Sequence, residues 1–272
     1  MKIQFLFLAI LASVLNAATP TSNAPFLKPD EAIAKMTIPD GFEVKAFVAE
    51  PDIGEAIAFC FDEKGRLWTL ENYNYQTRRA HSTDKKNRIQ IFEDVDGDGF
   101  FDRSKDVITG LNVSTSVVTG HGGIWVANPP YLLFYPDKDR DDVPDAAPEV
   151  CLSGFGLEDT HSVMNSLEWG PDGWLYFTMG NTWVKPNAPK PIRDLQGIKS
   201  DDKTQYPMTK VYTRDTYPKS YHPMNKDEKE GGIFRCRPGG HDLELFARGM
   251  RNPWDMCMDS GFNWLATDND PG

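Results

Sequence analysis

The stretch WGPDGWLYFTMGN, residues 169–181, places a glycine-containing turn directly before a run of aromatic and aliphatic residues. A turn followed by such a run is typical of a β-hairpin. The same order recurs in FDEKGRLWTLEN (61–72), in GHGGIWVANPP (120–130) and in MDSGFNWLATDN (258–269), where the glycine is displaced by one position. The sequence therefore contains a repeated structural unit.

Short strands are also expected between the copies, in RIQIFED (88–94), YLLFYPD (131–137) and GGIFRCRP (231–238). Similar units of roughly 40 to 50 residues, each made of short strands, are typical of β-propellers, in which every blade is a four-stranded sheet. We therefore predict an all-β fold, a β-propeller with about four blades. A β-sandwich whose strands resemble one another by chance is the alternative. The aromatic residues expected between neighbouring blades are Trp68, Trp125, Tyr176 and Trp264.

The sequence stops within the fourth unit, at ATDNDPG, and a propeller that ends there leaves strand edges unpaired. We therefore expect the chain to be a fragment of a longer protein. The predicted segments are a signal peptide over 1–18, a lead-in over 19–41 and a partial propeller over 42–272 that carries a polar insertion at about 184–230.

The N-terminus indicates export. One lysine precedes the apolar run from Ile3 to Leu15, and the small residues Ala17 and Ala18 follow, as in a secretory signal peptide. A retained N-terminal anchor is the alternative, and no other membrane span is predicted. We expect a periplasmic or extracellular location. The formal net charge of −11 argues against nucleic acids and anionic membrane surfaces as partners.

The four cysteines are widely scattered, and the sequence has no CxxC pair and no CxxCH motif. The sequence therefore encodes neither a zinc ribbon nor a c-type haem attachment site.

An aspartate-rich stretch, EDVDGDGFFD (93–102), matches the pattern DxDxDGxxD in full. In this pattern the carboxylates and one main-chain carbonyl converge on a single point, and the glycine permits the sharp turn. Such an oxygen-rich ligand set suits calcium, so we predict a structural Ca²⁺ site in a loop between strands. A solvated acidic turn is the alternative. The predicted ligands are Asp94, Asp96, Asp98, Asp102 and the carbonyl of Phe100.

A second copy of this loop begins 43 residues later, in PDKDRDDVPD (136–145). Asp142 stands where the first copy has Gly99, and aspartate tolerates a left-handed backbone better than most residues. We therefore predict a second, weaker Ca²⁺ site, again with a solvated acidic turn as the alternative. Its expected ligands are Asp137, Asp139, Asp141 and Asp145.

Three stretches resemble one family. EDTHSVMNSLEWGPDGWLYFTMGN (158–181) and GGIFRCRPGGHDLELFARGMRNPWDMCMD (231–259) resemble strands and turns of soluble quinoprotein glucose and sorbosone dehydrogenases. The opening LKPDEAIAKMTIPDGFEVKAFVAEPDI and the aspartate-rich blades resemble exported dehydrogenase-like proteins of planctomycetes and verrucomicrobia. The resemblance extends from about Leu27 to the last residue. It implies a six-bladed propeller that carries pyrroloquinoline quinone (PQQ) and oxidises a sugar or other alcohol, with a cytochrome as a possible electron acceptor.

The resemblance also implies roles for single residues. His161 is the candidate general base, because imidazole can accept a proton from an alcohol near neutral pH. Arg251 is the candidate partner of the anionic oxygens of the cofactor, because guanidinium carries a permanent charge. Asn252 and Asp159 are additional cofactor-binding candidates. The structural alternatives are a buried histidine that joins a loop to a strand and an arginine that caps a blade turn.

Two other functions remain open at the level of the sequence. One is a non-catalytic, calcium-stabilised propeller that binds carbohydrate through exposed aromatic residues. The other is a metal-dependent hydrolase of the lactonase type, whose candidate ligands would be Glu71, Asn165 and Asp268.

Overall fold

The computed structural model describes residues 27–73, 87–111, 113–129, 131–153, 155, 163–180 and 231–269. The predicted signal peptide and the predicted insertion at 184–230 lie outside these residues. The chain divides into two compact units, residues 1–46 and 47–272. The first unit contains helix α1 (Pro29–Ile33), which begins with a proline and has two acidic residues in its first turn. Both features favour a helix N-terminus.

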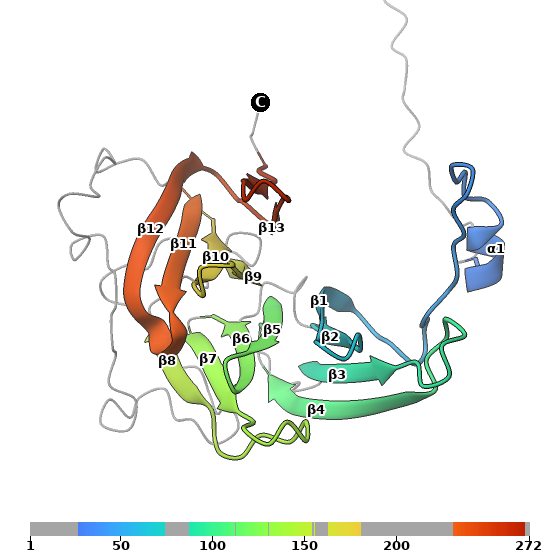
Figure 1. Cartoon of the computed structure of the whole chain (residues 1–272), viewed down its shortest axis with the longest axis horizontal. Helices are drawn as coiled ribbons and strands as arrows, with labels where there is room; N and C mark the ends of the chain where they lie inside the picture. Colours follow the sequence, from blue (N-terminus) through green and yellow to red (C-terminus); the bar gives the residue numbers. More distant parts are fainter. Residues whose placement is uncertain are drawn as a thin grey trace, which may run out of the picture. The chain divides into compact units, whose positions relative to one another are not determined.

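The described part of the second unit contains four antiparallel sheets (Figure 1). The first consists of β1 (Ala56–Phe61), β2 (Leu67–Glu71), β3 (Asn87–Glu93) and β4 (Arg103–Leu111). The second consists of β5 (Ser116–Gly120), β6 (Gly123–Asn128), β7 (Tyr131–Pro136) and β8 (Glu149–Ser153). The third consists of β9 (Met164–Trp169), β10 (Leu175–Met179), β11 (Gly231–Arg237) and β12 (His241–Met250), with the 3₁₀ turn η4 (Pro238–Gly240) between the last two strands. β13 (Met256–Met258) and β14 (Trp264–Ala266) form a hairpin.

Each sheet packs face to face on the next one along the chain. Strand β6 shows how: Ile124 and Val126 lie in a core shared with the first sheet, whereas Trp125 and Ala127 lie in a core shared with the third. Successive side chains of a strand point to opposite faces, so one central sheet can contribute to two cores. The described residues thus form an incomplete β-propeller, with three four-stranded blades and a hairpin of a fourth, which confirms the predicted fold class.

The aromatic residues predicted between blades are found there. Trp68 lies in the core between the first and second blades, and Trp125 lies in the core between the second and third. The rings of Tyr176 and Trp264 meet between the third blade and the last hairpin, with their centroids 4.4 Å apart. The repeated turn-then-aromatic order therefore corresponds to the contacts that join the blades.

The displaced glycine of the fourth copy has a structural explanation. Gly65 and Gly173 adopt positive φ values of 76° and 73° in the hairpin turns of the first and third blades. In the last hairpin, the equivalent residue by hydrogen bonding is Phe262, whose φ is 65°. The carboxylate of Asp259 accepts hydrogen bonds from the backbone N–H groups of Gly261 and Asn263, as Asp62 does in the first blade. The aspartate fixes this turn although the glycine is not at the left-handed position.

Candidate functional site

The first aspartate-rich loop lies between β3 and β4, and its carboxylates organise its backbone. Asp94 accepts hydrogen bonds from the N–H groups of Gly97 (2.6 Å) and Gly99 (2.9 Å), and Asp102 accepts one from Val95 (2.6 Å). Carboxylate oxygens of Asp94, Asp96 and Asp102 lie within 4.8 Å of one another. The structure therefore brings together three of the four predicted carboxylate ligands.

Asp98, the fourth predicted carboxylate of this loop, is not part of that group. Its Oδ1 accepts a hydrogen bond of 2.8 Å from the N–H of Phe100, the residue predicted to offer its carbonyl. Asp98 therefore stabilises the turn through this hydrogen bond.

The second loop, between β7 and β8, also gathers three carboxylates, but its third member differs from that of the first loop. Asp137 accepts hydrogen bonds from the N–H groups of Asp141 and Asp142, both 3.2 Å long. Carboxylate oxygens of Asp137, Asp139 and Asp141 lie within 4.8 Å of one another. Asp145, the remaining predicted ligand, lies outside this group and accepts a hydrogen bond of 2.9 Å from the N–H of Lys138.

The backbones of the two loops agree at the positions where they turn. Gly97 and Gly99 have φ values of 79° and 94°, and the residues 43 positions later, Arg140 and Asp142, have φ values of 60° and 66°. Asp142 thus adopts the left-handed conformation that the sequence comparison of the loops required. Both loops present three converging carboxylates, a set of hard oxygen ligands that could hold a divalent cation such as Ca²⁺.

Asp137 is the most enclosed of these carboxylates, with 6% of its surface exposed. Burial raises its pKa, although hydrogen bonds from the backbone of Asp142 and Asp141 act in the opposite direction. Asp137 also lines a cavity of about 60 Å³ between the first and second blades, where the β1–β2 turn faces the β5–β6 turn.

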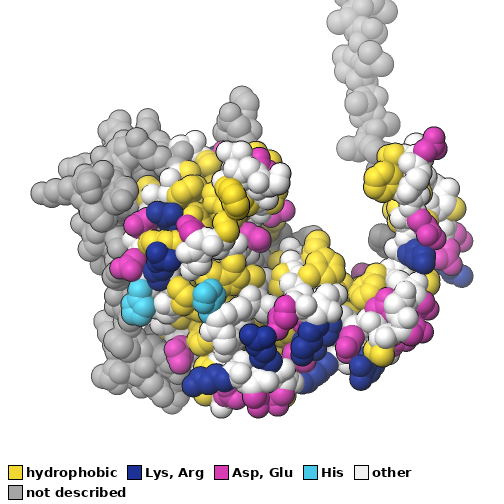
Figure 2. Space-filling model, viewed as in Figure 1, with side chains coloured by type: hydrophobic (Ala, Val, Ile, Leu, Met, Phe, Trp, Pro, Cys, Tyr) yellow, Lys and Arg dark blue, Asp and Glu magenta, His cyan; other side chains and the backbone are white. Residues whose placement is uncertain are grey.

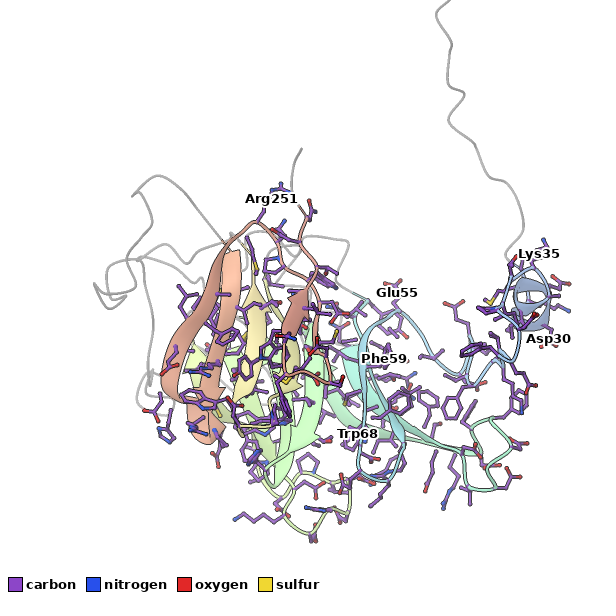
Figure 3. All side chains as sticks on the ribbon, turned by 45° about the horizontal axis from the view of Figure 1, so that its top comes forward. Asp30, Lys35, Glu55, Phe59, Trp68 and Arg251 are labelled. Carbon is purple, nitrogen blue, oxygen red and sulfur yellow. The ribbon has the colours of Figure 1, made fainter. Side chains whose placement is uncertain are left out.

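The turn after β12 carries the predicted anion-binding residue Arg251. The carboxylate of Asp268 accepts hydrogen bonds from the backbone N–H groups of Arg251 (3.0 Å), Asn252 (2.8 Å) and Asn269 (2.8 Å). The guanidinium of Arg251 is exposed and donates to Oδ1 of Asn269 at 3.0 Å. Figure 3 shows Arg251 beyond the end of the third sheet. Asn252 is buried, with 7% of its surface exposed.

The candidate ligands of a lactonase-type metal site have other contacts. Glu71 is fully buried, and its two oxygens accept hydrogen bonds from Arg88, Tyr73 and the N–H of Gly54. Asn165 accepts a hydrogen bond from the hydroxyl of Thr178. Within the described residues, the groups of converging carboxylates are those of the two aspartate loops, and neither includes Glu71 or Asp268.

The charge of Glu71 is set by these neighbours. Burial raises its pKa, but the hydrogen bonds from Arg88, Gly54 and Tyr73 outweigh burial and hold the pKa below its usual range. A carboxylate has about four lone-pair positions, and four protein donors occupy them. A metal ion at Glu71 would have to displace Arg88, so the structure favours a structural role for this carboxylate.

The predicted general base His161 and the predicted cofactor-binding Asp159 lie outside the described residues. Among the described residues, no helix has the length and the apolar character that crossing a bilayer requires. Acidic and basic side chains lie interspersed on the face drawn in Figure 2.

The solved structures that are similar to this chain include three with low sequence identity. A chain in the crystal structure of a nidogen/laminin complex is 12% identical, with a TM-score of 0.46, over 82% of this chain and 60% of that chain. A candidate gluconolactonase is 14% identical, with a TM-score of 0.46, over 85% of this chain and 61% of that chain. The PQQ-bound aldose sugar dehydrogenase of Streptomyces coelicolor is 16% identical, with a TM-score of 0.28, over 49% of this chain and 40% of that chain. The chain thus spans less than two thirds of the length of these structures.

No curated protein matches the sequence. The model of a family described as a domain of unknown function, DUF7133, matches residues 28–209, which is more than half of the chain. This match begins just before α1 and includes the first two blades and both aspartate loops. The chain therefore belongs to the DUF7133 family.

Proposed function

We propose that this chain is the propeller part of an exported quinoprotein-type dehydrogenase that oxidises a sugar or other alcohol. The observation that carries the proposal is the Arg251 turn, in which three backbone N–H groups are fixed on Asp268 while the guanidinium remains exposed. A permanently charged guanidinium on a fixed turn can bind anionic oxygens without a large cost of reorganisation.

The donors at this turn fit an anionic cofactor such as PQQ. Among the described residues, the hydrogen bond to Asn269 engages one of the five N–H donors that a guanidinium has. When bound, the quinone would accept a hydride from the substrate. Arg251 would hold the anionic oxygens of the cofactor, and His161 is the sequence-based candidate for removing the hydroxyl proton. A cytochrome would serve as electron acceptor, in the periplasm or outside the cell.

Replacing Arg251 with alanine is expected to weaken PQQ binding at least tenfold, because a charge-assisted hydrogen bond contributes about 1.5–3 kcal/mol. Asp268 binds backbone N–H groups of the turn, so the fold should tolerate the substitution. Calorimetric titration of the chain with PQQ in the presence of calcium measures the change.

Arg103→Ala is the matched control for this titration, because Arg103 is an exposed arginine on β4 of the first blade that pairs with Glu93. It should leave PQQ affinity unchanged. Absence of saturable PQQ binding to the unaltered chain, or equal loss in both variants, would overturn the role of Arg251.

A second candidate function is a non-catalytic propeller that binds carbohydrate and is stabilised by calcium. The observation that supports its calcium stabilisation is the pair of aspartate loops, each with three carboxylates within 4.8 Å of one another. Saturable binding of oligosaccharides by a chain that does not bind PQQ would support this function over the dehydrogenase.

Calcium is expected to raise the melting temperature of the chain, and Asp96→Asn should remove most of that gain. A cation that binds only the folded state stabilises it by about 2.7 kcal/mol at a concentration 100 times its dissociation constant. Asp96 contributes an oxygen to the first loop. Thermal unfolding with calcium and with EDTA measures the effect, and Asp106→Asn, outside both loops, is the control. Equal melting temperatures with and without calcium would contradict both predicted sites.

A further inference from the structure

We propose that Arg66 and Asp142 form a lock between the first and second blades, and that this lock holds the second aspartate loop in place without a metal ion. Arg66 belongs to the β1–β2 turn of the first blade, and Asp142 belongs to the loop between β7 and β8 of the second. The two residues are 76 positions apart in the sequence.

The contact between them is bidentate and largely enclosed. The two terminal nitrogens of Arg66 donate to the two carboxylate oxygens of Asp142 at 2.6 and 2.7 Å. Only 11% of the Arg66 side chain and 14% of the Asp142 side chain are exposed. A bidentate pair fixes both the distance and the relative orientation of its partners, so this contact constrains the loop as well as attracting it.

Arg66 is itself held in position from its own blade. Its Nε and its backbone N–H both donate to Asp62, at 2.7 and 2.9 Å. Asp62 also accepts hydrogen bonds from the indole N–H of Trp68 and the backbone N–H of Lys64. The guanidinium is therefore oriented toward the second blade before the loop engages it.

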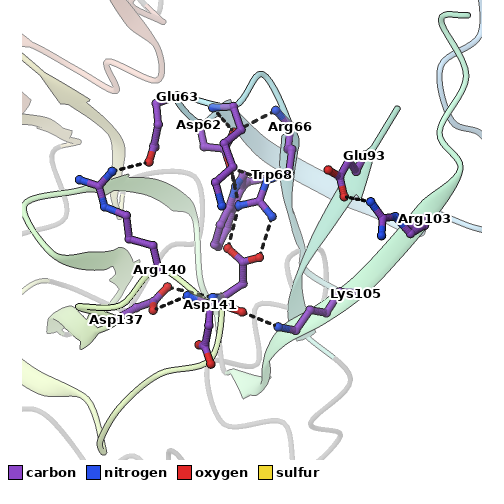
Figure 4. Close-up of polar contacts among 12 residues, drawn as sticks. Asp62, Glu63, Arg66, Trp68, Glu93, Arg103, Lys105, Asp137, Arg140 and Asp141 are labelled. Atoms are coloured by element: carbon purple, nitrogen blue, oxygen red, sulfur yellow. Dashed lines mark hydrogen bonds and ion pairs between the residues drawn. The ribbon is translucent and has the colours of Figure 1, made fainter. Parts of the chain in front are cut away.

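Two further contacts join the same loop to the first blade (Figure 4). The ammonium group of Lys105, on β4, donates to the carbonyl oxygen of Asp141 at 2.9 Å. Arg140, in the loop, donates to Glu63, in the β1–β2 turn, at 2.9 Å. These two contacts are exposed, and exposed pairs contribute little by themselves, so we assign the principal role to the Arg66–Asp142 pair.

The lock explains why an aspartate stands where the first loop has glycine. Asp142 adopts a φ of 66°, a conformation that glycine adopts at lower cost. Glycine at this position would lack the carboxylate that Arg66 binds. The second loop therefore has a less favourable backbone and gains a cross-blade ion pair.

The two loops should consequently differ in their need for a cation. In the second loop a basic side chain of the neighbouring blade compensates part of the acidic charge. Backbone N–H groups bind carboxylates of the loop itself in both cases, so the difference lies at one position: Arg66 binds the carboxylate of Asp142, whereas Gly99 of the first loop has no side chain. This inference is independent of the proposed oxidation chemistry, because it concerns only contacts within the chain.

Hydrogen–deuterium exchange measured by mass spectrometry in EDTA tests the lock. In the unaltered chain, the amides of 138–145 should exchange more slowly than those of 95–102. Arg66→Met should accelerate exchange at 138–145 by about tenfold or more, because it removes the partner of Asp142. Exchange at 95–102 should remain unchanged and serves as the internal reference.

Asp142→Gly distinguishes the effect of the ion pair from the effect of backbone strain in the loop. It removes the carboxylate that Arg66 binds, keeps Arg66 and the β1–β2 turn, and relaxes the backbone of the loop. It should also accelerate exchange at 138–145, whereas a loop governed by backbone strain would become more protected. Arg103→Met, at an exposed pair on β4 that is also drawn in Figure 4, should have no effect at 138–145. Unchanged exchange at 138–145 in Asp142→Gly, or equally fast exchange of both loops in the unaltered chain, would overturn the proposal.

Discussion

Trp125→Ala is expected to lower the free energy of unfolding by about 3–5 kcal/mol, the usual cost of removing a large aromatic side chain from a core. Trp125 is 1% exposed and lies between the second and third blades. Its ring centroid is 4.6 Å from that of Phe134 and 5.6 Å from that of Trp169, and its indole N–H donates to the carbonyl of Gly120. Alanine would leave a cavity between two blades that are held in place by other contacts.

Urea denaturation followed by circular dichroism measures this loss. Phe59→Ala is the control, because the side chain of Phe59 is 68% exposed on β1 and its removal should change the free energy of unfolding by less than about 0.5 kcal/mol. A loss below about 1 kcal/mol for Trp125→Ala would show that the second and third blades do not depend on this residue.

Glu71→Gln is expected to lower the free energy of unfolding by about 3 kcal/mol at neutral pH, because it removes one partner of an enclosed ion pair. Glu71 is fully buried, and Arg88, on the neighbouring strand, donates to both of its oxygens at 2.7 and 3.2 Å. The amide would keep the shape of the side chain but would present an N–H group to donors that need an acceptor.

The effect of Glu71→Gln should depend on pH. Despite the opposing effect of burial, Arg88, Gly54 and Tyr73 lower the pKa of Glu71 in the folded chain. A carboxylate with a lowered folded-state pKa stabilises the fold above its unfolded pKa, which is about 4.3, and this stabilisation is lost as the pH falls through the folded-state value. The difference between the two proteins should therefore be constant above about pH 5.5 and shrink in more acidic solution.

Urea denaturation at several pH values checks this behaviour. Glu63→Gln is the control, because Glu63 forms an exposed pair with Arg140, and an exposed pair contributes at most about 1 kcal/mol. A difference for Glu71→Gln that grows toward acidic pH would contradict the assignment of Glu71 as an ionised structural carboxylate.

The blade architecture could be predicted because its signals are local. A glycine turn followed by alternating apolar residues specifies a hairpin and tells which side chains face a neighbouring sheet. The aspartate loops could be recognised for the same reason, since their residues lie within ten consecutive positions. The left-handed conformation of Asp142 could be predicted because this residue occupies the position of Gly99 in the second loop. Its ion pair with Arg66, which explains the aspartate, could not be predicted.

The cross-blade contacts could not be predicted, because they depend on which distant turns meet. Arg66 and Asp142 are 76 residues apart, and neither flanking sequence indicates the other. Glu71 was a candidate metal ligand because it ends a strand of the predicted blade. Its partner Arg88 became evident only from the register between β2 and β3, in which the two residues lie opposite each other. Strands can thus be predicted from local sequence, whereas predicting which side chains contact each other requires the tertiary structure.

The alternation along β6 has a consequence for how such a chain can vary. A substitution at Ile124 or Trp125 changes one side chain in one core. Inserting a single residue before them would turn every later side chain of the strand to the opposite face of the sheet. Trp125 would then face the core between the first and second blades, and the smaller aliphatic residues would face the core between the second and third. We therefore expect insertions and deletions in the connections between strands and not within a central strand such as β6, where they would reverse the alternation of the side chains.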